Sequence, residues 1–366
     1  MTEWRVGLAP CGVVLQRDHL KQMIRLLRLL FKLSQLPNYR HAVADLLPQV
    51  ARFDPGYAAV MMGYDFHLGP QGAQLIEVNT NAGGGLLAYL AHAPLGLDAF
   101  YRNRVLHAFH REMTLASHGT MGTPGLIAIL DENPQQQFLY PEMLAFRDLF
   151  RQQGINAEVV EPEQLRMDAQ GVSLEGRRVD LVYNRHCDFY LESEALVGLR
   201  AAYLAGTVCV TPNPFAYGLL ADKRRMILWS DPDVLAELGI AAHHIDLLQA
   251  TIPKTRLLSQ MDREALWQDR KHWVFKPVTS FGSRGVVLGK GVSRARFLSL
   301  EPELTLVQQM VSPSTTFCDG ENTELKVDFR LFAYQNRVLG VSARLYQGQV
   351  TNFRLHGNGF AAVRVV

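Results

Sequence analysis

Apolar and polar residues alternate along the chain with two different periods, and the changes of period predict three regions. Between residues 122 and 215, short apolar runs (GLIAIL, AEVV, VDLVYN, TVCVTPN) alternate with helical patterns, one reaching Arg151 and one over residues 191–205. Gly154 is typical of a helix end. Strands that alternate with helices at this spacing predict a parallel sheet, so we expect a Rossmann-like α/β domain here.

The two flanking regions follow other patterns. After residue 220, strand-like runs such as WVFKPV, GVVLG, LTLVQQMV, VDFRLFAY and VLGVSARLYQ are separated by Gly, Asn or charged residues. That pattern favours antiparallel strands in an α+β arrangement. The first 120 residues are mainly helical, except for a predicted hairpin formed by GYDFHL and AQLIEVN. We expect a mixed α+β and α/β fold with domains at 1–120, 121–218 and 219–366.

Basic residues interrupt one apolar helical pattern. Residues 20–33 place apolar side chains around much of a helix that also carries Lys21, Arg25, Arg28 and Lys32. A helix lying on a membrane surface is one interpretation. A helix packed on the protein core, whose basic side chains cover apolar surface with their stems, is favoured.

Composition narrows the classes of function. Apolar residues make up 48% of the chain and charged residues 20%, and the formal net charge is +2, so the charge gives no indication of a nucleic-acid partner. No apolar stretch reaches the length of a membrane span. The four cysteines form no CxxC pair and no disulfide-like pattern. We therefore expect a cytoplasmic protein with reduced cysteines and with no membrane or nucleic-acid partner.

Three oxygen-bearing side chains lie on the predicted hairpin. Glu77 and Asn79 are two residues apart, so they face the same side of a strand. Asp65, on the first strand, can lie opposite them across the turn. Carboxylate and amide oxygens suit Mg²⁺, which takes its remaining ligands from phosphates and water. The NAGGG run at 81–85 allows close approach of the backbone to a ligand. An ordinary polar outer face is the alternative.

Two lysines are candidates for phosphate binding. Lys276 ends an apolar run and precedes a glycine-containing loop, SFGSRG, whose amides and neighbouring ammonium group can hold phosphate oxygens. Lys223 precedes an apolar helix, where a positive charge opposes the helix dipole unless an anion lies nearby. Taken singly, an exposed lysine beside a hairpin turn and a solvated basic helix start are the favoured interpretations.

Charged side chains gather on the predicted strands near the C-terminus. VDFRLF places Asp328 and Arg330 on one face of a strand, and the runs that follow supply Arg344, Asn352 and Arg354. Guanidinium groups match carboxylates and phosphates, so these arginines predict an anion site. Arginines on an exposed outer face of the sheet are an equal alternative.

Together these motifs resemble the ATP-grasp superfamily. DKRRMILW resembles its lysine-containing helix, WVFKP with SFGSRGV its lysine strand and glycine loop, and LVQQMV its adenine-contacting strand and hinge. VDFRLF with TNFR and GNG resembles the core of peptide-type carboxylate–amine ligases. GYDFHL with LIEVNTNAGG is similar to the metal-binding hairpin of D-alanine–D-alanine ligases and glutathione synthetases. In that family an Asp and a Glu-x-Asn pair hold magnesium, and Asp65, Glu77 and Asn79 match this pattern.

The order of the motifs differs from that of ordinary family members. There the Glu-x-Asn hairpin follows the arginine strands, whereas here it comes first, after a segment (40–63) that resembles the helix normally preceding it. Joining the two chain ends restores the usual order, and ends that lie close together tolerate permutation. The resemblance therefore implies a circularly permuted ATP-grasp fold. The α/β region resembles the domain before the grasp in glutathionylspermidine synthetase-like proteins.

The resemblance also implies ATP and Mg²⁺ as cofactors and a two-step ligation. A substrate carboxylate takes the γ-phosphoryl group to form an acyl phosphate, and an amine or a thiol then displaces phosphate. The implied metal ligands are Asp65, Glu77 and Asn79, and the implied catalytic residues are Arg330, Arg344 and Arg354. The implied nucleotide-binding residues are Lys223, Lys276, Ser280, Gly282, Ser283, Gly285, Gln308, Gln309 and Val311.

The sequence departs from the family pattern in two respects, and three other functions are alternatives to a ligase. Gln308 and Gln309 occupy the hinge where many members carry an acidic residue for the ribose, and no amidase domain accompanies the ligase motifs. A phosphotransferase, a non-catalytic nucleotide-binding scaffold and an ATP-independent metal hydrolase are the alternatives. Arg185, His186 and Asp188 follow a predicted parallel strand and are candidates for a substrate edge, and a capped strand end is an equal alternative. The expected substrates are small-molecule or peptide carboxylates and amines, and the sequence indicates neither their identity nor the oligomeric state.

Overall fold

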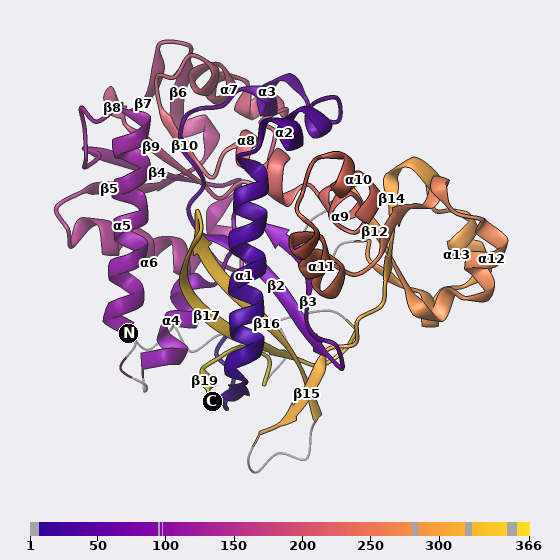
Figure 1. Cartoon of the computed structure of the whole chain (residues 1–366). Coiled ribbons are helices and arrows are strands. Elements are labelled where there is room, and N and C mark those ends of the chain that lie inside the picture. Colours follow the sequence, from indigo (N-terminus) through magenta and orange to yellow (C-terminus); the bar gives the residue numbers. More distant parts are fainter. Residues whose placement is uncertain (1–6, 94–95, 97, 280–284, 319–323, 350–356) are drawn as a thin grey trace.

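The hairpin near the N-terminus and the strands near the C-terminus belong to one sheet. The computed structural model describes residues 7–93, 96, 98–279, 285–318, 324–349 and 357–366. Its largest sheet runs in the order β18, β17, β16, β2, β3, with β15 also paired to β16 (Figure 1). These strands span Gly359–Ala361, Arg337–Tyr346, Glu324–Tyr334, Met62–Gly69, Gly72–Asn79 and Ser314–Phe317, respectively. All their pairings are antiparallel, and β2 and β3 form the predicted hairpin.

A long amphipathic helix covers one face of this sheet. α1 (Arg17–Ser34) buries one side, which includes Met23, Leu26 and Leu30, in the core that it shares with the sheet. Its basic residues, Lys21, Arg25, Arg28 and Lys32, are exposed. α1 is therefore a packed helix, as the favoured interpretation of its sequence expects.

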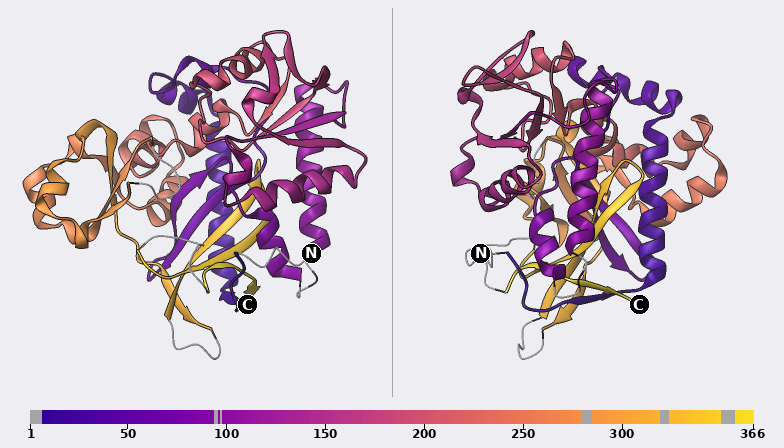
Figure 2. Two further views of the ribbon diagram at one scale, coloured as in Figure 1. Left: turned by 180° about the vertical axis from the view of Figure 1, so that it is seen from behind. Right: turned by 90° about the vertical axis from the view of Figure 1, so that its left-hand side faces the viewer.

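A second helix of similar length stands beside α1. This helix, α5 (Asp98–Ala116), follows α4 (Gly85–His92), and Figure 2 shows the axes of α1 and α5 nearly parallel in the side view. Phe109 of α5 packs against Phe146 and Tyr183 of the neighbouring α/β lobe. α5 therefore joins the central sheet to that lobe.

The predicted parallel sheet is present between residues 126 and 211. Its strands follow the order β10 (Cys209–Thr211), β9 (Leu181–Asn184), β4 (Leu126–Leu130) and β5 (Asn156–Val160), and all pairs are parallel. The sheet packs with α6 (Tyr140–Arg151) and α7 (Val197–Leu204). β4 and β9 are buried along their whole length, which explains the apolar runs LIAIL in β4 and LVY in β9. A small antiparallel sheet lies beside α7 and comprises β6 (Leu165–Asp168), β7 (Gly171–Leu174) and β8 (Arg177–Val179).

A third, smaller lobe projects to one side in Figure 1. Its sheet has the order β11, β14, β12, β13 and is antiparallel. These strands span Thr255–Leu257, Thr305–Gln309, Trp273–Pro277 and Val287–Leu288, respectively. α12 (Arg263–Gln268) and α13 (Arg294–Leu298) complete its own small core around Phe275 and Phe297. The remaining α-helices are α2 (Pro37–Ala44), α3 (Gln49–Arg52), α8 (Pro214–Ala216), α9 (Arg225–Trp229), α10 (Pro232–Glu237) and α11 (Ala242–Thr251).

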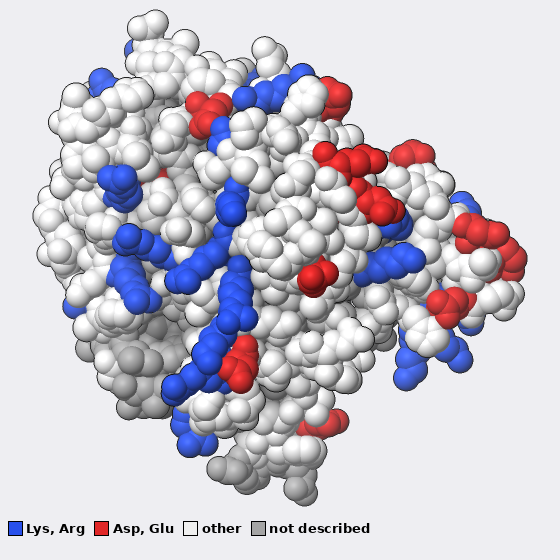
Figure 3. Space-filling model, in the orientation of Figure 1, with Lys and Arg blue, Asp and Glu red and all other residues white. Residues whose placement is uncertain are grey.

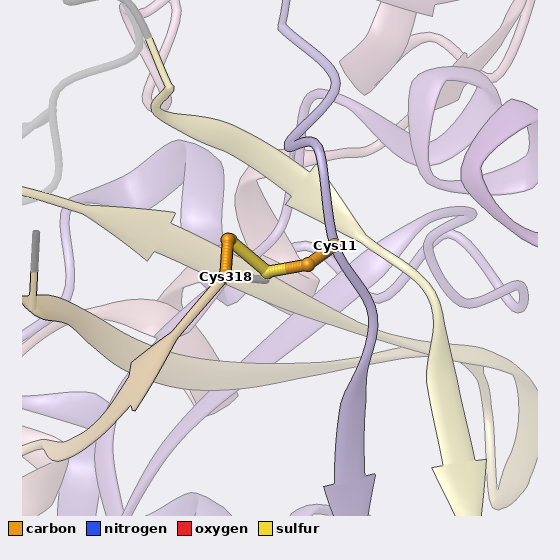
Figure 4. The surroundings of a disulfide bond; sticks show 2 residues. All are labelled: Cys11 and Cys318. Carbon is orange, nitrogen blue, oxygen red and sulfur yellow. A yellow bond between two sulfur atoms is a disulfide. The ribbon is translucent and has the colours of Figure 1, made fainter. Parts of the chain in front are cut away.

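The two ends of the described chain lie side by side. A disulfide near them corrects the expectation that all four cysteines are reduced. β1 (Val13–Leu15) pairs in parallel with β19 (Val363–Val365). Close to this pair, Cys11 and Cys318 form a disulfide (Figure 4). The bond joins residues 307 positions apart, so no local spacing in the sequence reveals it. Cys187 and Cys209 form no disulfide.

The mixed α/β fold agrees with the fold class predicted from the sequence. Within the described residues, the helices are all too short or too polar to cross a membrane. The domain boundaries at 120 and 218, and the circular permutation, stay predictions.

Candidate active site

The three oxygen-bearing side chains of the hairpin lie together. Asp65 on β2 is directly opposite Glu77 on β3, and Asn79 is opposite Gly63. The Asn79 amide nitrogen donates to Asp65 Oδ2 (3.2 Å) and to Glu77 Oε1 (3.3 Å). The strand pairing thus brings the three residues into one hydrogen-bonded group, as their spacing in the sequence predicts.

Two arginines from the neighbouring strands hold Asp65. Arg330 on β16 donates from Nε to Asp65 Oδ1 (2.6 Å) and from Nη2 to Oδ2 (2.7 Å), which is the bidentate geometry of a guanidinium–carboxylate pair. Nη2 of Arg344, on β17, lies 2.9 Å from Asp65 Oδ2. Burial opposes ionisation of Asp65, but the two guanidinium groups outweigh it and lower its pKa to about 2.

A second carboxylate balances this buried network. Asp328 on β16 is the cross-strand partner of Arg344, whose Nε donates to it. Two aspartates and two arginines, all at most 9% exposed, therefore form one ionic cluster. The sequence placed Asp328 and Arg330 on one strand face, but Asp328 was not among the predicted site residues. Its signal was the Asp-x-Arg spacing.

Lys276 reaches from the small lobe towards the hairpin. Its Nζ donates to the side-chain oxygen of Gln308 on β14 (2.6 Å) and to the backbone carbonyl of Ile76 on β3 (3.1 Å). Gln308 in turn donates to Thr255 Oγ1 (3.3 Å). Burial lowers the pKa of Lys276 to about 8, although the nearby Glu77 carboxylate acts in the opposite direction. Both of these described hydrogen-bond partners of Lys276 are neutral, and a buried ammonium in such surroundings is suited to bind an anion.

Some of the other predicted nucleotide-binding residues line the cavity with Lys276, and others lie outside the described residues. Lys223 and Gln309 line the same cavity as Lys276. Val311 also lines it, and its carbonyl lies 2.7 Å from Nδ1 of His67 on β2. Gly285 has a φ of +73° and lies against Pro277. Four predicted residues lie outside the described part of the chain, namely Ser280, Gly282, Ser283 and Arg354.

One cavity of about 970 Å³ contains most of these groups, and it lies where the three lobes meet. The hairpin, the arginine strands, the small lobe and the α/β lobe all contribute to its walls. Its charged lining residues are Asp65, Glu77, Asp131, Arg185, Lys223, Lys276, Lys290, Lys326, Asp328, Arg330 and Arg344. Segments far apart in the sequence therefore converge on one mixed-charge site.

The comparisons with known proteins find likeness in structure and none in sequence. No protein-family model matches the chain, and no curated protein matches it. A solved structure of a glutathione synthetase-like effector from Globodera pallida, in its apo form, has a TM-score of 0.62 at 11% identity and covers 99% of this chain and 90% of that one. A candidate γ-glutamylcysteine synthetase from Methylobacillus flagellatus KT has a TM-score of 0.53 at 13% identity and covers 94% of this chain and 87% of that one.

The fold is of the ATP-grasp type. Identities this low establish the fold and leave the activity to be argued from the site. In this ATP-grasp-type fold the cavity lies between the small lobe, the central sheet and the carboxyl ends of the parallel strands.

Sequence reasoning identified only part of the cavity end formed by the α/β lobe. Arg185, noted as a candidate substrate edge, follows β9 and lines the cavity, but His186 and Asp188 instead hydrogen-bond within their own turn. Asp131, which was not predicted, follows the adjacent strand β4 and also lines the cavity. Burial raises the pKa of Asp131 to about 6, although Arg185 lowers it. The signal for Asp131 was its position at the end of a buried parallel strand.

The loop after the hairpin connects the two ends of the cavity. Arg330 Nη1 donates to the carbonyl of Gly83 (3.1 Å), and Arg185 Nη1 donates to the carbonyl of Asn81 (3.0 Å). Glu142 accepts hydrogen bonds from the backbone at the start of α4, including that of Gly84 (2.7 Å). The loop thus fixes an arginine on each side.

The site offers two side chains that suit a divalent cation. Glu77 and Asn79 line the cavity, are partly exposed, and carry oxygens that suit Mg²⁺. Asp65 fits less well, because its two oxygens already accept hydrogen bonds from Arg330, Arg344 and Asn79. Within the described residues, no group of three or more His, Cys, Asp or Glu side chains has the arrangement of a metal site. Phosphate oxygens would therefore have to supply further ligands.

Proposed function

We propose that the protein is an ATP-dependent ligase that joins a carboxylate to an amine through an acyl phosphate. The observation that supports this most is the convergence of Lys276, Glu77, Asn79 and Arg330 on one cavity in an ATP-grasp-type fold. Phosphate-binding cations, oxygen donors for a metal and an arginine for developing negative charge are the groups that phosphoryl transfer to a carboxylate requires.

In the first step, a carboxylate oxygen of the substrate attacks the γ-phosphorus of ATP, and the bond to the β-phosphate oxygen breaks to release ADP. Lys276 and Lys223 bind the phosphates. Glu77 and Asn79 would hold Mg²⁺, which would supply positive charge to neutralise the transferred group. Asp65 and the Gly83 carbonyl hold the Arg330 guanidinium in place beside the reacting oxygens.

In the second step, the amine nitrogen attacks the acyl carbon, inorganic phosphate leaves, and the nitrogen loses a proton. Arg330, with Arg344 behind it, stabilises the oxyanion of the tetrahedral intermediate. Arg185, at the other end of the cavity, is placed to bind a second anionic group of the substrate. Arg354 keeps its predicted assisting role.

Titration calorimetry with ATP, with and without Mg²⁺, tests the binding part of the proposal. The parent protein should bind ATP in a Mg²⁺-dependent manner, and Glu77→Ala/Asn79→Ala should lose that dependence. Glu237→Ala/Gln153→Ala, which removes two exposed side chains outside the cavity, is the control. A folded parent that binds no adenine nucleotide under either condition would contradict the proposal.

Hydroxylamine tests the chemistry. An acyl phosphate reacts with it to give a hydroxamate, so a panel of amino acids and short peptides should yield a hydroxamate together with ADP and phosphate when the correct carboxylate is present. A stable phosphorylated product without a hydroxamate would instead identify a phosphotransferase.

A further inference from the structure

A second cavity lies outside the candidate active site, between α1 and α5. Its volume is about 740 Å³, and its floor is formed by β17, β19 and the end of α4. Apolar floor residues include Val338, Val341 and Val363. Figure 1 shows α1 and α5 standing side by side with β17 between them. The cavity is therefore a groove with helical walls and an apolar floor.

The walls of the groove extend over about two helical turns. α1 contributes Leu20, Ile24 and Arg28, and α5 contributes residues from Phe100 to His107. Eight residues of α-helix rise by about 12 Å. Phe100 is 57% exposed, which is unusual for a large aromatic side chain and leaves part of one wall uncovered.

Every charged side chain that lines the groove is an arginine. The lining includes Arg28, Arg104, Arg337 and two histidines, and it includes no aspartate or glutamate. Arg104 donates to the backbone carbonyl of Val338 (2.8 Å), and its guanidinium lies over the Phe100 ring, 3.8 Å from the ring centre. None of the three arginines pairs with a carboxylate in the part of the chain that the structure describes. On the face drawn in Figure 3, lysines and arginines gather over the middle and left, around α1 and α5, whereas most acidic side chains lie towards the right.

The basic groups continue along the outer face of α1. Lys21, Arg25, Arg28 and Lys32 recur at spacings of four, three and four residues, so they form one exposed row beside the groove. This is the basic helix that the sequence marked out, and the proposed ligase site makes no use of it.

We propose that this groove binds an acidic amphipathic helix of a partner protein. Apolar side chains of such a helix would lie on the floor between α1 and α5, and its acidic flanks would meet the arginines on both walls. Charge complementarity of this kind also favours rapid association. The proposal is independent of the ligase function.

The arrangement fits a helix better than an anionic lipid. The apolar residues of the floor lie between the two helices, where a flat bilayer would not reach them. The cations are spread along both walls, whereas a single acyl chain carries its charge at one end. A second copy of this chain would bring one basic groove against another in a symmetric dimer.

Fluorescence anisotropy with synthetic helices tests the proposal on the full chain. The first probe has about 14 residues, with leucines at spacings of three and four and glutamates along both flanks. The second carries lysine in place of glutamate, and the third carries serine in place of leucine. The first probe should bind, the other two should bind at least about tenfold more weakly, and about 0.5 M salt should weaken the first.

Matched variants locate the binding. Arg28→Glu/Arg337→Glu should weaken the first probe at least about tenfold, whereas the control Arg177→Glu/Lys271→Glu, outside the groove, should not. Phe100→Ser should weaken it, whereas Phe317→Ser, at a similarly exposed phenylalanine on β15, should not.

Several outcomes would overturn the proposal. They are no binding of the first probe at about 100 μM, equal binding of the lysine probe, or equal losses in the control variants. Binding of the parent to phosphatidylglycerol-containing vesicles that Arg28→Glu/Arg337→Glu abolishes, without binding of the first probe, would assign the groove to a membrane surface instead.

Discussion

At the scale of single residues, paired charges dominate the candidate site. Asp65 and Asp328 balance Arg330 and Arg344, so the buried cluster carries little net charge of its own. Arg330 takes its position from this cluster. The charge of a bound nucleotide would therefore be met by other groups, foremost Lys276, Lys223 and a metal at Glu77 and Asn79.

Replacing Asp65 by asparagine should destabilise the protein by about 3–5 kcal/mol, because two buried guanidinium groups would lose their shared carboxylate. The lowered pKa of Asp65 also makes the free energy of unfolding depend on pH. Because the pKa of Asp65 is about 2 in the native state, its carboxylate stabilises the fold by roughly 2–3 kcal/mol above pH 4, and this stabilisation is lost as the pH falls through 2. Urea unfolding at neutral pH measures the first effect, with the exposed Asp246→Asn as control. A loss below about 1 kcal/mol would show that the ion cluster is not formed in solution.

Lys276 should make ATP binding depend on pH. Because burial lowers its pKa to about 8, the free protein loses this positive charge as the pH rises through 8, and ATP affinity should fall by up to about tenfold per pH unit above that. Binding near pH 8.5 should take up a proton, which calorimetry in two buffers of different ionisation heat detects. Lys276→Arg keeps its charge and should show neither effect. An unchanged slope in Lys276→Arg would assign the pH dependence to another group.

At the scale of elements, the glycine run after β3 lets the loop approach its neighbours. Gly84 has a φ of +86°, and a Cβ there would lie 1.9 Å from the ring of buried Phe360. A Cβ at Gly83 would lie 3.0 Å from the Arg185 guanidinium. These glycines therefore allow the loop to hold Arg185 and Arg330.

Gly84→Ala should lower the free energy of unfolding by about 2–4 kcal/mol, combining backbone strain with a clash against a rigid ring. Gly56 provides the matched control, because its φ is +78° and a Cβ there would meet nothing within 4 Å. Gly56→Ala should cost only about 1 kcal/mol. Equal losses in urea unfolding would mean that φ alone sets the cost at Gly84.

The elements themselves could largely be predicted from the sequence. The parallel strands and the hairpin have distinct apolar periods, and the strand spacing was enough to place Asp65 opposite Glu77. The pairing of β2 with β16 could be predicted only through the family resemblance, because it depends on contacts across 265 residues, as the Asp65–Arg330 pair shows. The sequence did not predict that Asp65 pairs with both Arg330 and Arg344. The pattern within one strand does not specify which residues of other strands will contact it.

At the scale of the whole molecule, contacts between distant segments decide what the sequence left open. The β1–β19 pair joins the two ends of the described chain, and the Cys11–Cys318 disulfide joins the N-terminal segment to the residue that follows β15. The groove between α1 and α5 likewise exists only after the helices pack on β17. The sequence marked the basic row of α1, but it could not indicate which apolar surface lies beside that row.

The Glu112 carboxyl, buried where α5 meets β10 and β16, should make the free energy of unfolding depend on pH. Glu112 on α5 is fully buried, and its Oε1 accepts a hydrogen bond from the Ala58 amide (3.1 Å). Burial raises its pKa to about 7, although the hydroxyls of Tyr334 and Thr211 and the amide lower it. The native state therefore keeps the proton to a higher pH than the unfolded chain does. Protonated Glu112 therefore contributes fully to stability below about pH 4.5. As the pH rises through 7 the free energy of unfolding falls by about 3 kcal/mol.

Glu112→Gln should remove that slope, because the amide stays neutral at every pH and retains an acceptor for the Ala58 amide. Urea unfolding at pH 5 and pH 8 should show the variant losing less stability with pH than the parent, by about 2–3 kcal/mol. Glu132→Gln, at an exposed position, should follow the parent. Parallel curves for Glu112→Gln and the parent would mean that Glu112 ionises as readily in the native state as in the unfolded chain. Water or a rearranged partner would then have to reach Glu112 between α5 and β16.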